Sequence, residues 1–238
     1  VERWRMFQPD SDIQRLSTLT AFLKDCGIDS YEDLVRRATE EPDWFWGRII
    51  DHAGIRFGKP HTVLRDISDG PESIRWAVGA TLNLTETCLD ARIHEGLGEK
   101  TAIDWVGEDG SRRRWTYSEL SAEVARVASA LDARGVQPGQ AVGIYMPMIP
   151  EIEAALLGIA RLGAVAVPLF SGFAPHAIIS RLKDAGAVAV LTADASPRRG
   201  KPVWMEAVLA EALTEVPSVH TVFSLRRFGG AVADPARD

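Results

Sequence analysis

The sequence has few cysteines, and the two that it has are far apart. Cys26 and Cys88 are the only cysteines among 238 residues, and neither belongs to a C-x-x-C pair. This usage is typical of a reducing compartment and offers no framework of disulfides and no zinc site. We therefore expect a cytoplasmic protein in which both cysteines are buried as small hydrophobic residues.

Long apolar runs and an excess of positive charge are also missing. No stretch approaches the roughly 18 apolar residues of a membrane span. Residues 1–12 are charged where a secretory signal would be apolar. The formal charge of −6 gives nucleic acid or an anionic membrane no general attraction. We expect neither of them as a partner.

Glycine-rich nucleotide fingerprints are absent as well. No G-x-G-x-x-G follows a predicted strand, and GIARLG at residues 158–163 lacks the Lys-Ser or Lys-Thr of a phosphate loop. No H-E-x-x-H motif, nucleophile elbow or metal-spaced cluster occurs, and the five histidines are scattered. These absences argue against a flavodoxin-like or dehydrogenase-type nucleotide domain. They also predict no metal site, and each histidine is expected to be a surface or satisfied core residue and not a catalyst.

What is present divides into two regions, residues 1–82 and residues 83–238. The first is rich in tryptophan and charge, and its patterns predict helices within residues 11–27, 29–40 and 42–54. The first of these helices carries its apolar face at helical spacing, on Ile13, Leu16, Leu19, Phe22 and Leu23. No strand alternates convincingly before about residue 100. We expect a mostly helical N-terminal extension whose aromatic residues pack onto a neighbouring domain.

From residue 100 the pattern changes to strands that alternate with helices. Residues 101–117 predict a hairpin, and Thr116 with Glu119 predicts a capping box at the start of a helix. Pro150 and Pro175 suit the first turns of two further helices, which end at Gly163 and Gly186. Residues 202–216 predict one more helix, and residues 230–238 a linker. Apolar strands are predicted at 141–145, 164–170, 187–193 and 218–225.

This alternation predicts an α/β fold with a mainly parallel sheet and helices on both faces. Ligands of such sheets bind beyond the carboxyl ends of the strands. The candidate segments are therefore MPMIPE (146–151), SGFAPH (171–176) and DASPRRGK (194–201). Met146 and Met148 in the first segment are expected to fill gaps in the core.

Several of these segments together resemble AMP-forming acyl-CoA synthetases of the adenylate-forming superfamily. The resemblance is to the acetyl-CoA and acetoacetyl-CoA synthetase branch, and it covers nearly the whole chain from about Ser30. In the leader it lies in EEPDWFW (40–46) and IRWAVGATLNLTETCLD (74–90). Later it lies in WTYSEL (115–120), in residues 135–151 and in residues 160–194. One departure is that Ala91 and Arg92 stand where the branch has Arg followed by His.

The resemblance implies a ligase that uses ATP with Mg²⁺ and coenzyme A. Such an enzyme activates a short carboxylic acid as an acyl-adenylate, and the thiol of coenzyme A then displaces AMP. The family's phosphate loop and catalytic lysine come later in its chain, and none of the five lysines here matches that lysine (Lys24, Lys59, Lys100, Lys183 and Lys201). We therefore expect the N-terminal part of a protein more than twice as long, which is inactive alone and self-associates through surface exposed by truncation.

The resemblance also implies part of a coenzyme A site. FSGF at residues 170–173 matches the family's FGGF turn, so Phe170, Ser171 and Gly172 would lie against the nucleotide end of coenzyme A, with Ser171 replacing a glycine. Arg198 falls where the branch has a phosphate-contacting arginine, and Lys201 where it has a second one. An arginine can bind phosphate through two parallel hydrogen bonds. The alternative is a solvated loop that happens to hold these cations.

A second hypothesis is a non-catalytic binding or assembly module. Its motivation is the tryptophan content, because five of the seven tryptophans precede residue 110. In that case the leader would bind a partner, and the sheet would serve only as a scaffold.

Overall fold

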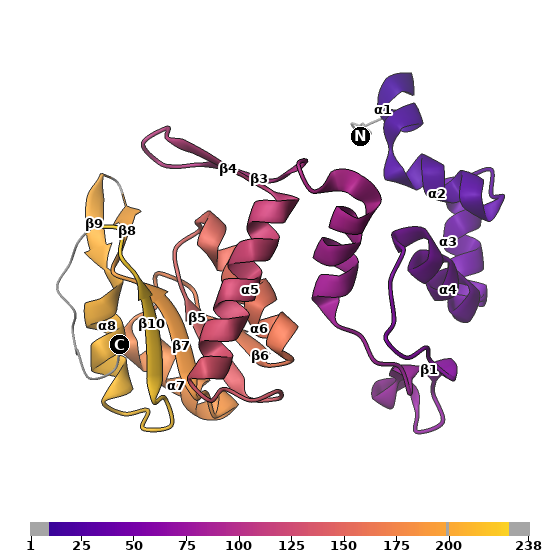
Figure 1. Cartoon of the computed structure of the whole chain (residues 1–238). Helices are drawn as coiled ribbons and strands as arrows, with labels where there is room; N and C mark the ends of the chain where they lie inside the picture. Colours follow the sequence, from indigo (N-terminus) through magenta and orange to yellow (C-terminus); the bar gives the residue numbers. More distant parts are fainter. Residues whose placement is uncertain (1–9, 199, 229–238) are drawn as a thin grey trace, which may run out of the picture. The chain divides into compact units, whose positions relative to one another are not determined.

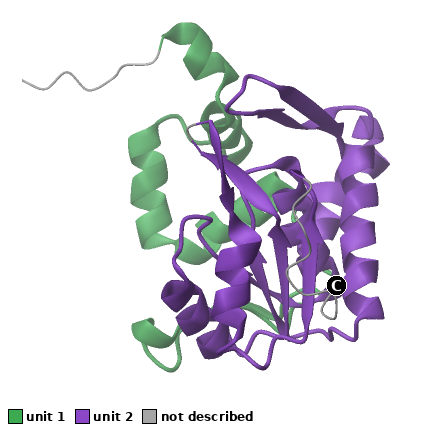
Figure 2. Cartoon of the chain, turned by 90° about the vertical axis from the view of Figure 1, so that its left-hand side faces the viewer, with its two compact units in different colours: residues 1–82 green, residues 83–238 purple. Residues whose placement is uncertain are grey.

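The computed structural model describes residues 10–198 and 200–228. The chain folds as two compact units, residues 1–82 and 83–238 (Figure 2). None of the helices within the described ranges combines the length and apolar character needed to cross a membrane. The predicted linker at residues 230–238 lies outside the described residues.

Unit 1 begins with four helices, which are α1 (Ser11–Leu16), α2 (Thr18–Cys26), α3 (Tyr31–Glu40) and α4 (Pro42–Ala53) (Figure 1). α3 starts after Ser30 because the hydroxyl of Ser30 accepts a hydrogen bond from the Asp33 amide at 3.0 Å. Pro42 occupies the first turn of α4, and Gly54 ends this helix in the left-handed conformation at φ 63°. The predicted helical character of this region is confirmed.

The prediction of one continuous helix within residues 11–27 is wrong, because the helix breaks at Ser17. Ser17 is extended (φ −72°, ψ 143°), and its hydroxyl accepts the Thr20 amide at 3.1 Å. The serine therefore caps a new helix instead of continuing the first. Only part of the predicted apolar face is buried, since Phe22 is buried and Ile13 is exposed.

The expectation of no strand before residue 100 is also wrong. β1 (Val63–Asp66) and β2 (Arg75–Val78) pair antiparallel, with a short 3₁₀ helix at Pro71–Ser73 between them. Each strand has four residues and buries none of them. Neither strand therefore shows the apolar alternation that identifies a half-buried strand in a sequence.

The aromatic side chains of unit 1 pack on one another. Phe45 meets Phe22 and Trp46 edge to face, with ring centroids 6.2 Å and 5.3 Å apart. Trp46 in turn meets Trp76 at 5.6 Å. These contacts join α2, α4 and β2 within the unit.

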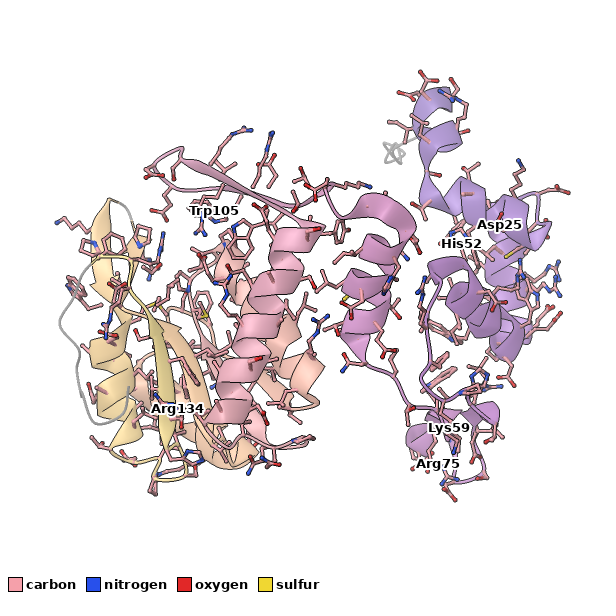
Figure 3. The ribbon with its side chains drawn as sticks, in the orientation of Figure 1. Asp25, His52, Lys59, Arg75, Trp105 and Arg134 are labelled. Atoms are coloured by element: carbon pink, nitrogen blue, oxygen red, sulfur yellow. The ribbon has the colours of Figure 1, made fainter. Side chains whose placement is uncertain are left out.

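A polar contact joins α2 and α4 as well. The Nδ1 atom of His52 lies 2.8 Å from a carboxylate oxygen of Asp25, and Figure 3 shows the two residues side by side.

Unit 2 opens with two short π-helices and a hairpin. These are η2 (Glu86–Asp90), η3 (Ile93–Leu97), β3 (Thr101–Val106) and β4 (Arg112–Thr116). The helices that follow are α5 (Tyr117–Ala133), α6 (Pro150–Leu162), α7 (Pro175–Ala185) and α8 (Met205–Leu213). The remaining strands are β5 (Ala141–Tyr145), β6 (Val165–Pro168), β7 (Ala189–Ala193), β8 (Ala195–Arg198), β9 (Lys201–Trp204) and β10 (Thr221–Leu225).

The helix boundaries of unit 2 follow from local chemistry. At the start of α5 the Glu119 amide donates to the Thr116 hydroxyl at 3.2 Å, and the Glu119 carboxylate accepts the Thr116 amide at 2.7 Å. This is the predicted capping box. Gly163 and Gly186 end α6 and α7 with φ of 78° and 60°. A side chain would be strained in that conformation.

Four parallel strands form the central sheet in the order β10-β7-β5-β6. Val142 and Ile144 of β5 join the core against α5 and α6. Ala141 and Tyr145 of the same strand join the core against α7 and α8. Figure 1 shows the two helix pairs on opposite faces of the sheet. The predicted α/β fold with helices on both faces is therefore confirmed.

The prediction of a loop at residues 194–201 and of a helix from residue 202 is wrong. β8 and β9 form an antiparallel hairpin in which Pro197 faces Pro202 and Arg198 faces Lys201. The helix begins only at Met205. Proline donates no backbone hydrogen bond, so the two prolines argue against strands in the sequence. A short hairpin that pairs with no other strand nevertheless tolerates them.

The segment that leads into unit 2 is fastened to the end of α6. The side-chain amide of Asn83 donates to the carbonyl groups of Ala160 and Arg161 at 3.3 and 3.1 Å. The Arg161 guanidinium forms an ion pair with Asp90. At the site of the departure from the family pattern, Ala91 is fully buried and Arg92 pairs with Glu95 at 3.1 Å.

The expectation that both cysteines are buried is wrong. Cys26 is half-buried, Cys88 is exposed, and both are free thiols. Cys88 lies in η2, which presents only Leu89 fully to the interior.

Candidate functional site

The candidate site lies at the carboxyl ends of the parallel strands, at the point where the chain changes direction. From β5 the chain crosses to β6 on one side, whereas from β7 it continues to β10 on the other side. The segments that leave β5 and β7 therefore diverge. In open α/β sheets this divergence creates the crevice in which ligands bind.

A pocket of about 560 Å³ occupies this edge of unit 2. Its walls come from the β3–β4 hairpin (residues 105–108), the end of β5 (Tyr145 and 147–149), the turn after β6 (170–174), the β8–β9 hairpin (196–198 and Val203), α8 (Val208) and the loop after β10 (Arg227). The charged residues of this lining are Glu108, Arg198 and Arg227. The pocket therefore combines apolar walls with a small excess of positive charge, which suits a ligand that has both an aromatic ring and phosphate groups.

Four of the five residues predicted to contact coenzyme A line this one pocket. Phe170, Ser171 and Gly172 come from the turn after β6, and Arg198 comes from the end of β8. Lys201 stands opposite Arg198 in the hairpin register but lies outside the pocket lining. Arg198 and Lys201 are both exposed.

The turn after β6 presents an aromatic ring beside a bare backbone. Phe170 is 66% exposed and meets Phe173 edge to face at 5.7 Å. A Cβ atom on Gly172 would lie 2.7 Å from the Phe170 ring. Any side chain at position 172 would therefore displace this ring, and glycine allows the ring to lie against the backbone.

Tyr145, at the end of β5, holds the same turn through hydrogen bonds. Its hydroxyl donates to the carbonyl groups of Ser171 and Phe173, both at 3.3 Å, while its ring is 1% exposed. Burial raises the pKa of the Tyr145 phenol above its usual value. The phenol therefore stays protonated and remains a hydrogen-bond donor to the turn.

The opposite wall is the β3–β4 hairpin, which is fastened to the segment after β5. The indole Nε1 of Trp105 donates to the Met148 carbonyl at 2.7 Å. Arg113 binds Glu151 through two hydrogen bonds of 3.1 and 2.5 Å. Figure 3 shows Trp105 at the end of the sheet opposite to Arg134.

The expectation that both methionines of this segment pack in the core holds for one of them. Met146 is buried at 6% exposure, whereas Met148 is 76% exposed and lines the pocket. The prediction for Met148 is wrong because the segment turns outward after Pro147 to meet Trp105.

Asp194 organises the loops on the far side of the pocket. This carboxylate is fully buried and accepts the backbone amides of Ala195, Arg227 and Phe228 at 2.7 to 3.0 Å. The backbone carbonyl of Asp194 accepts the amide of Met205 at 3.0 Å. One aspartate thus joins the ends of β7 and β10 to the start of α8.

Trp105 and Arg227 escaped prediction from the sequence, and Asp194 was placed in a candidate segment without a role. Only Asp194 carries a local signal, since it directly follows a buried strand at the ligand-binding edge. Trp105 and Arg227 reach the pocket from hairpin and loop segments whose position depends on the tertiary fold. No pattern in the sequence connects them to FSGF.

The chain matches known families over both units. Residues 91–235, more than half of its 238 residues, match the model of AMP-binding enzymes, and residues 31–88 match that of the acetyl-coenzyme A synthetase N-terminus.

Among curated proteins, an acetyl-coenzyme A synthetase of Parvibaculum lavamentivorans is 39% identical over 208 residues, covering 86% of this chain and 32% of its own length. One from Aeromonas salmonicida is 40% identical over 210 residues, covering 85% of this chain and 32% of its own length. The chain thus spans about a third of the length of these relatives.

A solved structure has the same fold. The acetoacetyl-CoA synthetase from Streptomyces lividans superposes with a TM-score of 0.86 at 28% identity, covering 95% of this chain and 36% of that chain. The family models, the relatives and this structure agree with the resemblance that the sequence motifs indicate. The chain therefore belongs to the AMP-binding enzyme family, and its sequence corresponds to the N-terminal part of an acyl-CoA synthetase.

Proposed function

We propose that this pocket binds the nucleotide end of coenzyme A in an AMP-forming acyl-CoA synthetase. The observation that carries the proposal is the convergence of Phe170, Ser171, Gly172 and Arg198 on one pocket at the carboxyl edge of the sheet. Arg198 belongs to a different segment of the sequence from Phe170, Ser171 and Gly172, and the family resemblance assigned all four to coenzyme A independently of their positions in space. Lys201 would add a second positive charge from the neighbouring strand.

Each residue has a physical role in this proposal. The exposed Phe170 ring offers a face on which a base can stack. Gly172 leaves the backbone open to close approach. Arg198 supplies paired donors for a phosphate group, and such charge-assisted hydrogen bonds contribute at best roughly 1.5–3 kcal/mol and less at an exposed position such as this one.

The whole reaction would join a short carboxylic acid to coenzyme A with cleavage of ATP to AMP. ATP with Mg²⁺ supplies the activation of the carboxylate. Within residues 10–198 and 200–228, no group of three or more His, Cys, Asp or Glu residues could hold a metal ion. The sequence also has no Ser/Thr/Gly-rich phosphate loop. We therefore propose that the 238-residue chain by itself forms no acyl-adenylate.

Calorimetric titration with coenzyme A tests the binding proposal. We expect saturable binding to the 238-residue chain and a clear loss of affinity in Arg198→Ala. Arg126→Ala is the matched control, because Arg126 is 69% exposed and pairs with Glu123 on the surface of α5. Absence of binding to the unmodified chain, or equal affinity in Arg198→Ala, would contradict the proposal.

A pyrophosphate-release assay with ATP, Mg²⁺ and acetate tests the second part. We expect no release above the background of a heat-denatured sample. Measurable turnover by the purified chain would show that an adenylation site exists in it.

We also propose that the chain self-associates and is cytoplasmic. β6 is an edge strand of the sheet, and its Val165 is 51% exposed, as is Leu84 at 50%. An unpaired edge beside apolar surface favours pairing with a second chain. Sedimentation velocity should show a dimer whose fraction rises with concentration, and a monomer throughout would contradict this. The two free cysteines fit a reducing compartment.

A further inference from the structure

We infer that Arg227 is a second phosphate-binding residue of this pocket and binds a phosphate group of coenzyme A together with Arg198. The inference rests on the proposed function, because it takes coenzyme A as the ligand of the pocket. Arg227 belongs to neither of the segments that the family resemblance assigns to that ligand. It follows β10, whereas Arg198 ends β8.

Arg227 is held in place by its backbone. Its amide donates to both carboxylate oxygens of Asp194 at 3.0 Å, and the next amide, of Phe228, donates to the same carboxylate at 2.7 Å. Asp194 itself is fully buried. The position from which the Arg227 side chain enters the pocket is therefore fixed before any ligand binds, and such preorganisation lowers the entropic cost of binding.

The guanidinium of Arg227 makes no ion pair with a described residue, although its charge acts on Asp109 and helps to lower the pKa of that carboxylate. By comparison, Arg113 pairs with Glu151, and Arg226 pairs with Glu206. In contrast, the Nη1 atom of Arg227 is buried and makes no hydrogen bond to any described residue. An unsatisfied buried donor is costly, so a phosphate oxygen that accepts from it would remove that cost.

The surroundings strengthen such a bond. Nη1 is shielded from water and has no hydrogen bond to a described residue to lose, so turning it toward a phosphate in the pocket breaks no such bond. Arg227 lies in the lining of the same pocket as Arg198, with Glu108 the single carboxylate in that lining. Two cations from separate elements match a ligand that carries more than one phosphate group.

Calorimetry with coenzyme A on four variants tests the inference. We expect Arg227→Ala and Arg227→Met to bind about 10- to 100-fold more weakly than the unmodified chain, which corresponds to loss of a charge-assisted hydrogen bond. Arg227→Met keeps the apolar stem and guards against a packing defect in the alanine variant. Arg227→Lys should lie between, because lysine keeps the charge but not the paired donors. Arg126→Ala should bind normally.

Ligand variants show whether the loss concerns phosphate. A loss with coenzyme A but not with 3′-dephospho-coenzyme A assigns Arg227 to the 3′-phosphate, and an equal loss with both assigns it to the diphosphate. Either result supports the inference. An equal loss with adenosine, which has no phosphate, would show a packing role and overturn it.

The outcomes separate this inference from the proposed function. If the unmodified chain binds coenzyme A and both Arg227→Ala and Arg227→Met bind equally well, the inference fails and the proposed function stands. If the unmodified chain does not bind coenzyme A at all, both fail. Thermal unfolding of each variant confirms that the compared proteins are folded.

Discussion

The indole nitrogen of Trp105 donates a hydrogen bond to the main-chain carbonyl of Met148 at 2.7 Å. Trp105 lies on the β3–β4 hairpin and Met148 follows the central strand β5, so this bond joins two walls of the candidate pocket. The bond explains why an otherwise exposed segment has a defined position at the pocket rim.

Trp105→Phe should loosen this wall. Phenylalanine keeps an aromatic ring but removes the donor, so the Met148 carbonyl loses its partner. We expect a loss of roughly 0.5–1.5 kcal/mol in the free energy of unfolding of unit 2 and weaker binding of coenzyme A. Urea unfolding and calorimetry measure the two effects. Trp76→Phe, in unit 1, is the control, and an equal effect of both substitutions would contradict a specific role for Trp105.

Gly172→Ala should impair binding more than folding. The added Cβ would lie 2.7 Å from the ring of Phe170, which is mostly exposed and can move away. The displaced ring no longer offers its face in the pocket. We expect a shift of no more than about 1 kcal/mol in unfolding free energy with a clear loss of coenzyme A affinity. Unchanged affinity in a folded Gly172→Ala protein would show that the position of Phe170 is irrelevant to binding.

Tyr145→Phe should reduce stability in a pH-dependent manner. Burial raises the pKa of Tyr145 in the folded state above the value of about 10 for an unfolded chain. The protonated phenol therefore stabilises the fold fully below pH about 10, and this contribution is lost as the pH rises from there through the raised folded-state pKa. Tyr145→Phe removes this alkaline loss.

Thermal unfolding between pH 8 and 11 measures the effect. The decline of the melting temperature above pH about 10 should be shallower in Tyr145→Phe than in the unmodified chain. Tyr31→Phe, at an exposed position, is the control. Parallel declines in the unmodified chain and Tyr145→Phe would rule out the buried phenol as their cause.

The ion pair of Asp90 and Arg161 should couple η2 to α6. Arg161 is 24% exposed and also donates to the Thr85 hydroxyl at 3.3 Å, so removal of Asp90 leaves a partly buried cation. We expect Asp90→Ala to cost about 1–3 kcal/mol. A double-mutant cycle with Arg161→Ala isolates the coupling between the two side chains.

The exposed pair Glu123–Arg126 provides the comparison for this cycle. An i,i+3 pair on a helix surface contributes about 0.5 kcal/mol or less. Equal coupling energies for the two pairs would show that the Asp90–Arg161 contact does not anchor the segment.

The alternating part of the fold was predictable because its signals are local. The capping box at Thr116, the first-turn prolines at 150 and 175 and the glycine ends of α6 and α7 each depend on a few neighbouring residues. The strand order was not predictable, because it is set by which distant strands pair. The order is what places the crevice between β5 and β7.

The candidate site was predictable only in part, for the same reason. Phe170, Ser171, Gly172 and Arg198 were identified through motif resemblance, which carries information about a ligand that local chemistry does not. Arg227 and Trp105 have no such motif, and the pocket gathers them through tertiary packing. The β8–β9 hairpin escaped prediction because its paired prolines are typical of loops.

Hydrogen–deuterium exchange with and without coenzyme A tests the location of the pocket most directly. We predict slower exchange in residues 145–149, 170–174 and 195–198 when coenzyme A is bound, with no change in the β1–β2 hairpin of unit 1. Slower exchange confined to other segments, or no difference under conditions in which coenzyme A binds, would contradict a coenzyme A site at the carboxyl edge of this sheet.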